Sequence, residues 1–292
     1  MKLVLLVVLV GVIAVSGCTS TGNVASFELL ISDQPIAIGE FDELLVQITE
    51  ATLFSNTGAP VTLTFSETVD LTQVVGDQAV PLITQNIPTG TYERISLSIA
   101  TATGVVAGEE VTIEVPSNML TFTKSFTVGE EPLSFVVDIS VVNAGQSGMY
   151  ILLPVISQTG VVGLDVAIQR GEIGADQKAA HADEILERAR ANLGRGDDAL
   201  DQEAYENARM AYQAAEKGFA IAQARYQQAR ILGATAAENG FTIAQQSSEA
   251  ANNMVRAVEA YQAGNNNMAE SLGQQAASII NNLPLGQRGG NP

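Results

Sequence analysis

The stretch "YENARMAYQAAEKGFAIAQARYQQA", residues 205–229, carries an aromatic residue at every seventh position and an alanine within each interval. These positions form one seam: Tyr205, Ala208, Tyr212, Ala215, Phe219, Ala222, Tyr226 and Ala229. Their spacing alternates between three and four residues, which is the heptad pattern of a helix that packs along one face. Large rings opposite small alanines allow a neighbouring helix to approach closely. The seam therefore predicts a long helix over residues 199–232 inside an antiparallel bundle.

The seam has two interpretations. Tyr205, Tyr212, Phe219 and Tyr226 either fill the core between the helices or face a partner protein. Core packing is the ordinary fate of an apolar helical stripe, and we favour it. The helices remain the better place for a protein partner, because they hold much of the aromatic surface and a mixed charge.

Shorter apolar stripes lie on both sides of the seam and predict about four helices, arranged as two αα-hairpins, over residues 171–283. The first helix is expected to end in "LGRGDD", where Gly194 or Gly196 could adopt a left-handed conformation. The segment "YQAGNNN", residues 261–267, predicts the turn between the third and fourth helices. Residues 284–292 are expected to be a flexible tail.

Upstream of the helices, residues 26–170 follow a different pattern. About nine short runs rich in Val, Ile, Leu, Thr and Phe are separated by Gly- and Pro-containing turns. In "TYERISLSI", for example, Ile95, Leu97 and Ile99 alternate with polar residues and should share one face of a strand. We therefore predict two domains, β then α: an antiparallel β-sandwich of the Ig/transthyretin-like type, followed by the antiparallel helical bundle.

Three pieces of this β half resemble a known family. They are "FDELLVQITEATLF", "VDLTQVVGDQAVPLITQNIPTGTYERISLSI" and "FVVDISVVNAGQSGMYILLPVI", and "IPTGTYERISL" is the most specific part. Over about residues 26–158 the chain is similar to an uncharacterised family of prokaryotic lipoprotein domains, catalogued as domain of unknown function 4382. The resemblance implies a sandwich on an exported, lipid-anchored protein. It implies no activity and no functional residues, and the helical half lies outside it.

The first 17 residues, "MKLVLLVVLVGVIAVSG", have one lysine and an apolar run shorter than the ~20 residues that a membrane-spanning helix needs. They predict a signal peptide, and "VSGC" fits the lipobox that precedes a lipidated cysteine. Cys18, the only cysteine in the chain, is then the lipid anchor, and residues 18–25 form a lipidated tether. The alternative is a buried structural cysteine behind an ordinary signal peptide.

Charge narrows the choice of partners. The chain has 14 basic and 32 acidic residues, a formal net charge of −18, and such a surface repels nucleic acid. The acidity is uneven, since residues 24–170 hold 17 acidic and 3 basic residues, whereas residues 171–292 hold 15 acidic and 10 basic residues. The predicted partners are the membrane, through the lipid on Cys18, and an envelope protein.

Catalytic and cofactor motifs are missing from the sequence. There is no G-x-S-x-G, Walker A or G-x-G-x-x-G motif, and His181, the only histidine, is expected to be a solvated helix residue. The acidic pairs Asp42/Glu43, Glu109/Glu110 and Glu130/Glu131 are expected to be solvated turns, because neighbours along a strand point to opposite faces. Glu109, Glu110, Glu130 and Glu131 remain weak candidates for a Ca²⁺ site. No cofactor is predicted.

These observations favour an exported, lipid-anchored cell-envelope protein with a non-enzymatic structural or protein-interaction role. It would be membrane-anchored outside the cytoplasm, at the cell surface or in the periplasm. The alternative is a surface protein that binds a small ligand, a sugar or Ca²⁺, through acidic loops of the sandwich. A hydrolase that uses paired carboxylates is a distant third, since it needs two carboxylates facing each other across a cleft.

Overall fold

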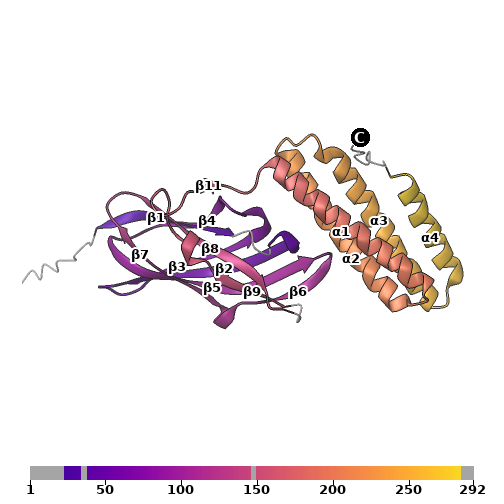
Figure 1. The fold of residues 1–292 in the computed structure, drawn as a ribbon, viewed down its shortest axis with the longest axis horizontal. Coiled ribbons are helices and arrows are strands. Elements are labelled where there is room, and N and C mark those ends of the chain that lie inside the picture. The colour runs from indigo at the N-terminus through magenta and orange to yellow at the C-terminus, as the bar shows by residue number, and fades with distance from the viewer. Residues whose placement is uncertain (1–22, 34–37, 146–148, 284–292) are drawn as a thin grey trace, which may run out of the picture.

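A computed structural model describes residues 23–33, 38–145 and 149–283. The predicted signal peptide (1–17), the lipid anchor Cys18, most of the tether (18–25) and the tail (284–292) lie outside the described residues. The described chain has two parts: a strand part, residues 24–170, and a helical part, residues 175–281 (Figure 1). The β-then-α order predicted from the sequence is confirmed.

The strand part forms one large, mostly antiparallel sheet with some parallel pairs. Its strands are β1 (Val24–Asp33), β2 (Phe41–Ser55), β3 (Val61–Asp70), β4 (Gln78–Pro88), β5 (Gly90–Val106), β6 (Glu109–Glu114), β7 (Met119–Val128), β8 (Leu133–Asn143), β9 (Met149–Pro154), β10 (Gly160–Val161) and β11 (Gln169–Arg170). The order is β11-β4-β1-β8-β9-β6-β5-β2-β3, with β7 added to β5 and β10 to β8. The sheet is mostly antiparallel, as predicted, but β1 runs parallel to β8, β6 parallel to β9 and β11 parallel to β4.

The larger of two hydrophobic clusters in the strand part lies inside this sheet. Phe126 of β7 packs against Phe27 of β1, Tyr92 of β5 and Phe135 of β8, with ring centroids 4.4–5.8 Å apart. Because β7 is not a neighbour of β1 or β8 in the sheet order, the sheet must curve around these rings. The alternating residues Ile95, Leu97 and Ile99 all belong to this core, as their period of two predicts.

Four helices follow: α1 (Ala175–Asp201), α2 (Tyr205–Ile231), α3 (Ala237–Gln262) and α4 (Asn266–Asn281). Connections of three to five residues join them. Each helix therefore packs against the next one along the chain, and α4 lies on the outside against α3 (Figure 1). The number of helices is as predicted, and the turn near Gly264 is where the sequence placed it.

The predicted end of the first helix is wrong. Helix α1 continues through Gly194 and Gly196 to Asp201, so the helix predicted over residues 199–232 begins only at Tyr205. Gly196 serves packing instead of termination, because a Cβ atom there would lie 2.3 Å from Cε1 of the Tyr212 ring. The chain reverses at Glu203, which has a φ of 57°. A glycine that accommodates a ring and a glycine that ends a helix look alike in the sequence.

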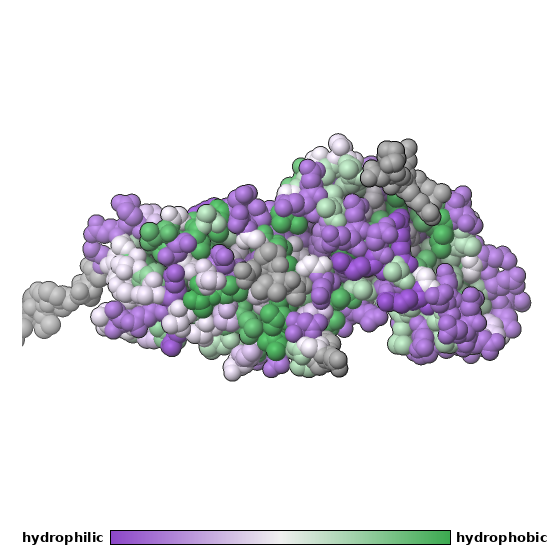
Figure 2. All heavy atoms as spheres, viewed as in Figure 1, coloured by the Kyte–Doolittle hydropathy of each residue, from purple (hydrophilic) through white to green (hydrophobic). Residues whose placement is uncertain are grey.

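No helix in the described part of the chain is long and apolar enough to cross a membrane. In the view of Figure 2, hydrophilic side chains dominate the helical part, and hydrophobic ones gather in patches over the strand part.

Candidate functional site

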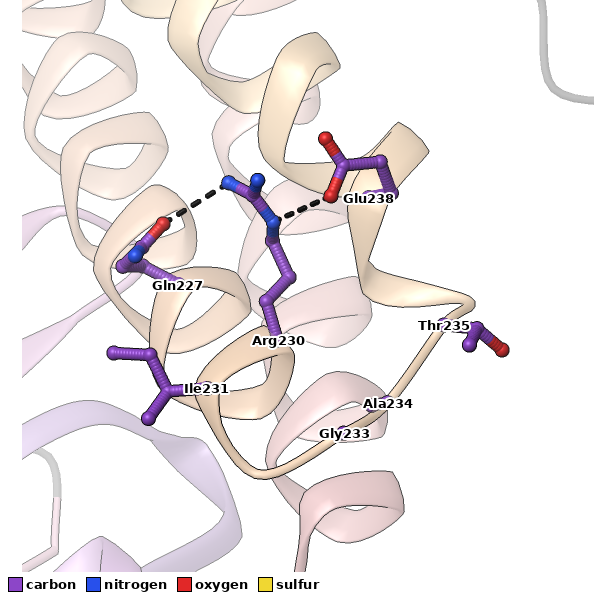
Figure 3. Close-up of a pocket in the computed structure, with 7 residues that line it drawn as sticks. All are labelled: Gln227, Arg230, Ile231, Gly233, Ala234, Thr235 and Glu238. Atoms are coloured by element: carbon purple, nitrogen blue, oxygen red, sulfur yellow. Dashed lines mark hydrogen bonds and ion pairs between the residues drawn. The ribbon is translucent and has the colours of Figure 1, made fainter.

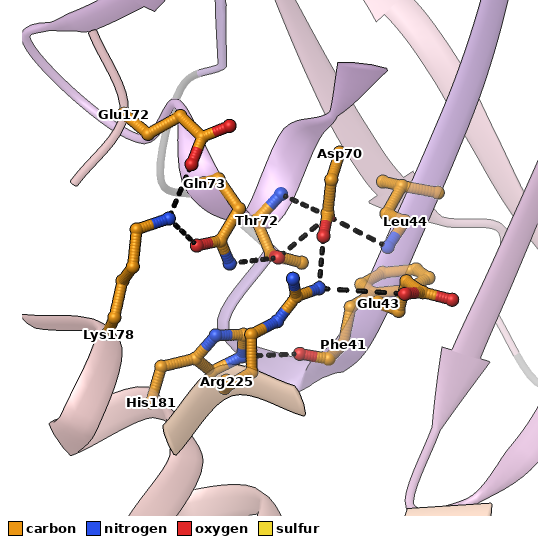
Figure 4. A network of polar contacts seen from close by, with 10 residues as sticks. All are labelled: Phe41, Glu43, Leu44, Asp70, Thr72, Gln73, Glu172, Lys178, His181 and Arg225. Atoms are coloured by element: carbon orange, nitrogen blue, oxygen red, sulfur yellow. Dashed lines mark hydrogen bonds and ion pairs between the residues drawn. The ribbon is translucent and has the colours of Figure 1, made fainter. Parts of the chain in front are cut away.

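Helices α1 and α2 meet one end of the strand part through a polar interface (Figure 4). The strand part contributes the start of β2, the β5–β6 turn and the short 3₁₀ helices η1 (Ile38–Glu40) and η2 (Leu71–Gln73). The helical part contributes mainly basic side chains. We call this set of contacts the polar interface.

Asp70 is the centre of the first group of contacts. Its carboxylate accepts hydrogen bonds from the backbone N–H and the hydroxyl of Thr72, at 3.1 and 2.7 Å, and so caps η2. The same carboxylate forms an ion pair with Arg225 of α2, a residue that is only 4% exposed. Glu43 lies 3.7 Å from the Arg225 guanidinium, and burial, followed by repulsion from Asp70, raises the Glu43 pKa. The Asp70 carboxylate thus caps the 3₁₀ helix that follows β3 and also binds α2 through Arg225.

Asp42 is the centre of the second group. It is fully buried, its Oδ2 accepts the backbone N–H of Gly108 at 2.7 Å, and its Oδ1 accepts Nε of Arg188 at 2.8 Å. Three segments, β2, the β5–β6 turn and α1, therefore meet at one carboxylate. Asp42 was expected to be a solvated turn residue, and that prediction is wrong because the helices cover it.

The β5–β6 turn lies close against α2. Gly108 has a φ of 76°, and a Cβ atom there would lie 1.8 Å from the carbonyl oxygen of Ala214 in α2. Asn192 of α1 donates to the Ala107 carbonyl, and Lys217 of α2 pairs with Glu110 at 2.6 Å. Only glycine fits between the turn and α2.

The first turns of α1 complete the interface. Lys178 is 2% exposed, donates to Oε1 of Gln73 at 2.6 Å and pairs with Glu172. His181 places Nε2 3.0 Å from the carbonyl oxygen of Phe41. A carbonyl only accepts, so Nε2 carries the proton, and burial lowers the pKa of the ring. The prediction that His181 is solvated is wrong: it is a half-buried interface residue.

The aromatic seam of α2 lies mostly in the core. Tyr212, Phe219 and Tyr226 are each at most 1% exposed. The hydroxyls of Tyr212 and Tyr226 donate to Asp197 and Asp183 of α1, at 2.7 and 2.5 Å. These bonds satisfy the one polar atom that each ring buries.

Tyr205, the first residue of the seam, is different. It is half-buried and lies against Tyr261 of α3, with ring centroids 4.9 Å apart. Tyr261 itself is 47% exposed. The two rings form one end of an open, mainly apolar groove.

This helical groove consists of two adjoining hollows of about 290 and 270 Å³. Its walls come from α1 and α4 and its floor from α3, with Leu193, Leu200, Tyr205, Met254, Tyr261 and Gly273 among the lining residues. Nothing lies within 4 Å of the position of a Cβ atom on Gly273, so the groove has free space there. An apolar side chain from another molecule could occupy that space.

A third hollow, of about 410 Å³, lies at the turn between α2 and α3 (Figure 3). Arg230 pairs there with Glu238 at 2.6 Å, and its guanidinium also stacks over the ring of Phe241, 4.5 Å from the ring centroid. Gln227 accepts a further hydrogen bond from Arg230. The charged groups of this hollow therefore satisfy one another.

The strand part is similar to a known protein family. Residues 24–154 match the family model described as domain of unknown function, DUF4382. Residues 24–154 are thus similar to this family, and we call the strand part the DUF4382 domain. The match ends with β9, so all four helices lie outside it. No curated protein and no solved structure matched the chain.

The acidic residues of the DUF4382 domain that were weak candidates for Ca²⁺ are spread over its surface. Glu109, Glu110, Glu130 and Glu131 are exposed. Glu110 pairs with Lys217, and Glu130 accepts a hydrogen bond from Asn23 at 3.3 Å. No group of three or more His, Cys, Asp or Glu side chains that could hold a metal ion occurs among the described residues.

The DUF4382 domain also buries two acids that the sequence analysis missed. Asp33 is fully buried at the end of β1, and Asp138 is 2% exposed in the middle of the neighbouring strand β8. Burial raises the pKa of Asp138 to about 6 and raises the pKa of Asp33, to which the Asp138 charge also contributes. In the sequence, each acid lies within or at the end of an apolar run, "LLISD" or "FVVDISVV". An aspartate in such a run predicts a buried carboxyl, and this pattern could have identified both residues.

Proposed function

We propose that this protein is an exported, lipid-anchored cell-envelope protein with a non-enzymatic, protein-interaction role. The DUF4382 domain is a rigid support, Cys18 is the anchor, and the helical groove binds an apolar segment of an envelope protein. The location is outside the cytoplasm, at the cell surface or in the periplasm.

The helical groove is the observation that carries this proposal. Leu193 and Leu200 on one wall, and Gly273 and Ile280 on the other, are each seven residues apart, so both walls extend for about two helical turns, or ~10 Å. A hollow of this length with an apolar lining suits an amphipathic helix, which presents side chains at the same spacing. The half-buried ring of Tyr205 and the exposed ring of Tyr261 are of the kind that dominates binding energy at interfaces.

The polar interface supports the same role. Its buried charges are paired across the two parts of the chain, as with Arg225 and Asp70, and this pairing fixes the direction in which the groove faces. The finer form of the fold is also part of the proposal. The ring contacts across the core favour a sandwich-like closure of the sheet, and the serial packing of the helices favours an antiparallel bundle.

A photo-crosslinking residue placed at Met254 in the groove floor tests the interaction. We expect one specific adduct from intact cells, identifiable by mass spectrometry. Gly273→Leu should fill the groove and abolish the adduct, while better helix propensity keeps the fold intact. Gly194→Leu is the matched control, since Gly194 is an equally open helical position outside the groove lining. An adduct that survives Gly273→Leu would refute the groove as the binding site.

The intact mass of the mature protein tests the anchor separately. We expect removal of residues 1–17 and the added mass of a lipid on Cys18. Cys18→Ser should abolish the added mass and release the chain from membranes. A wild-type chain with an unmodified thiol and its leader intact would refute the anchoring.

A further inference from the structure

The outer face of β1 and β8 carries a small, partly enclosed cavity that shares no lining residue with the helical groove. Ser32 and Asp138, which face each other in the parallel register of the two strands, lie at its buried base. Asp77 and Gln158 line its exposed rim, and residues 166–168 form an apolar wall. The cavity measures about 220 Å³.

One oxygen of the Asp138 carboxylate lacks a hydrogen-bond donor. Its Oδ1 accepts the hydroxyl of Ser32 at 2.7 Å, but its Oδ2 has no hydrogen-bond partner. No Lys or Arg among the described residues forms an ion pair with it. A buried carboxylate without a cationic partner is strongly unfavourable, so this site favours a positively charged guest.

The lining decides which kind of cation fits. The described residues offer no group of three metal-binding side chains, and one wall of the cavity is apolar, so a metal ion would lack ligands. An ammonium group needs only three acceptors. Asp138, Ser32, Asp77 and Gln158 all carry oxygen acceptors, while Val166 and Ile168 can cover carbon atoms. The volume is below the range of drug-sized ligand sites, so the guest must be small.

We propose that this cavity binds a small organic cation, with a primary ammonium group against Asp138 and its carbon chain along Val166 and Ile168. This site is independent of the helical groove and of the partner bound there. It differs from the acidic loops considered from the sequence, because its central acid lies inside the sheet.

Butylammonium is a suitable probe, and 1-butanol is its neutral counterpart of the same shape. Titration of the full chain in mild detergent should give saturable binding of butylammonium, on the order of mM, with a rise in Tm. Butanol and Ca²⁺ should give neither. Chemical-shift changes in NMR spectra should cluster at Ser32, Asp77 and residues 158–168.

Asp138→Asn should weaken butylammonium binding by ~10-fold or more, because the charge-assisted hydrogen bond is lost. The variant should still fold, since it removes an unpaired buried charge, and circular dichroism checks this. Glu131→Gln, an exposed acid elsewhere in the DUF4382 domain, should bind as the wild type does. No saturable binding, equal binding of butanol, unchanged binding by Asp138→Asn, or a response to Ca²⁺ alone would each overturn the proposal.

Discussion

Arg225 of α2 forms an ion pair with Asp70 of β3, although 155 residues separate them along the chain. Asp70 also accepts the backbone N–H of Thr72 and so determines how the chain leaves β3. The local geometry of the DUF4382 domain and the position of the helices therefore depend on one carboxylate. Charge distribution explains why the contact forms, since the strand part is rich in acids and most bases lie in the helical part.

Arg225→Ala should destabilise the protein by about 3 kcal/mol, because it leaves the Asp70 carboxylate largely buried and without its cation. Urea unfolding measures the loss, and limited proteolysis should show faster cleavage between the two parts, near residues 171–174. Arg256→Ala, on an exposed face of α3, is the control and should change stability by less than about 0.5 kcal/mol. Equal effects of the two variants would show that the ion pair does not hold the parts together.

Gly108→Ala should be far more harmful than Gly264→Ala, although both glycines have a φ of 76°. At Gly264 nothing lies within 4 Å of the added methyl group, so the cost is the backbone strain alone, about 1–2 kcal/mol. At Gly108 the methyl group would meet the carbonyl of Ala214 and force the turn away from α2. We expect a further loss of about 1–3 kcal/mol. If thermal unfolding gives the same loss for both, the turn does not approach α2 as described.

Two glycines in α1 should respond to alanine with opposite signs. Gly194→Ala, at an exposed position with open space, should stabilise the protein by about 0.5–1 kcal/mol through helix propensity. Gly196→Ala should destabilise it by about 1–2 kcal/mol, because the methyl group collides with the ring of Tyr212. Chemical denaturation of the two variants side by side provides the measurement. If both variants were more stable than the wild type, the Tyr212 ring would not pack against Gly196 as the structure shows.

The buried carboxyl of Asp138 should make stability depend on pH. Burial raises its folded-state pKa to about 6, and an unfolded chain has a pKa near 4. The folded state therefore holds the proton more tightly. This contribution, about 3 kcal/mol, is fully present below pH ~4 and is lost as the pH rises through about 6.

Urea unfolding of the wild type and of Asp138→Asn, from pH 4 to 8, measures this effect. The stability of the wild type relative to the variant should fall by about 3 kcal/mol over that range. Ser32→Ala should extend the fall to higher pH, because the Ser32 hydroxyl opposes the rise in the pKa. Parallel profiles for wild type and Asp138→Asn would contradict the buried state of this carboxyl. Asp33 shifts in the same direction, so only the difference between the two profiles is diagnostic.

The periodic parts of the fold could be predicted from the sequence, because the period of a pattern reports directly on burial. The alternation in residues 91–99 and the seam through Tyr212 and Tyr226 both appear in the structure as core faces. The strand order could not be predicted, since parallel pairs such as β1–β8 join segments far apart in the chain. Helix ends were misplaced where glycine had a packing role, as at Gly196.

The polar interface was invisible in the sequence for a similar reason. Asp42 and His181 look like solvent-facing residues when each segment is considered alone. They become buried only because the strand part and the helical part come into contact. The local sequence pattern of either segment does not predict that contact. The difference in charge between the halves was the one signal available. It pointed to the attraction between acids and bases but not to the residues that form it.

Strand β1 lies between β4 and β8, and it begins at Val24, at the end of the strand part away from the helices (Figure 1). In a chain held by Cys18, any pull on the molecule enters lengthwise through this central strand. The force is then shared by the hydrogen bonds on both sides of β1, which must shear together instead of opening one by one. A pulling force applied at Cys18 would therefore be borne by hydrogen bonds inside the DUF4382 domain and not by the helices that form the groove.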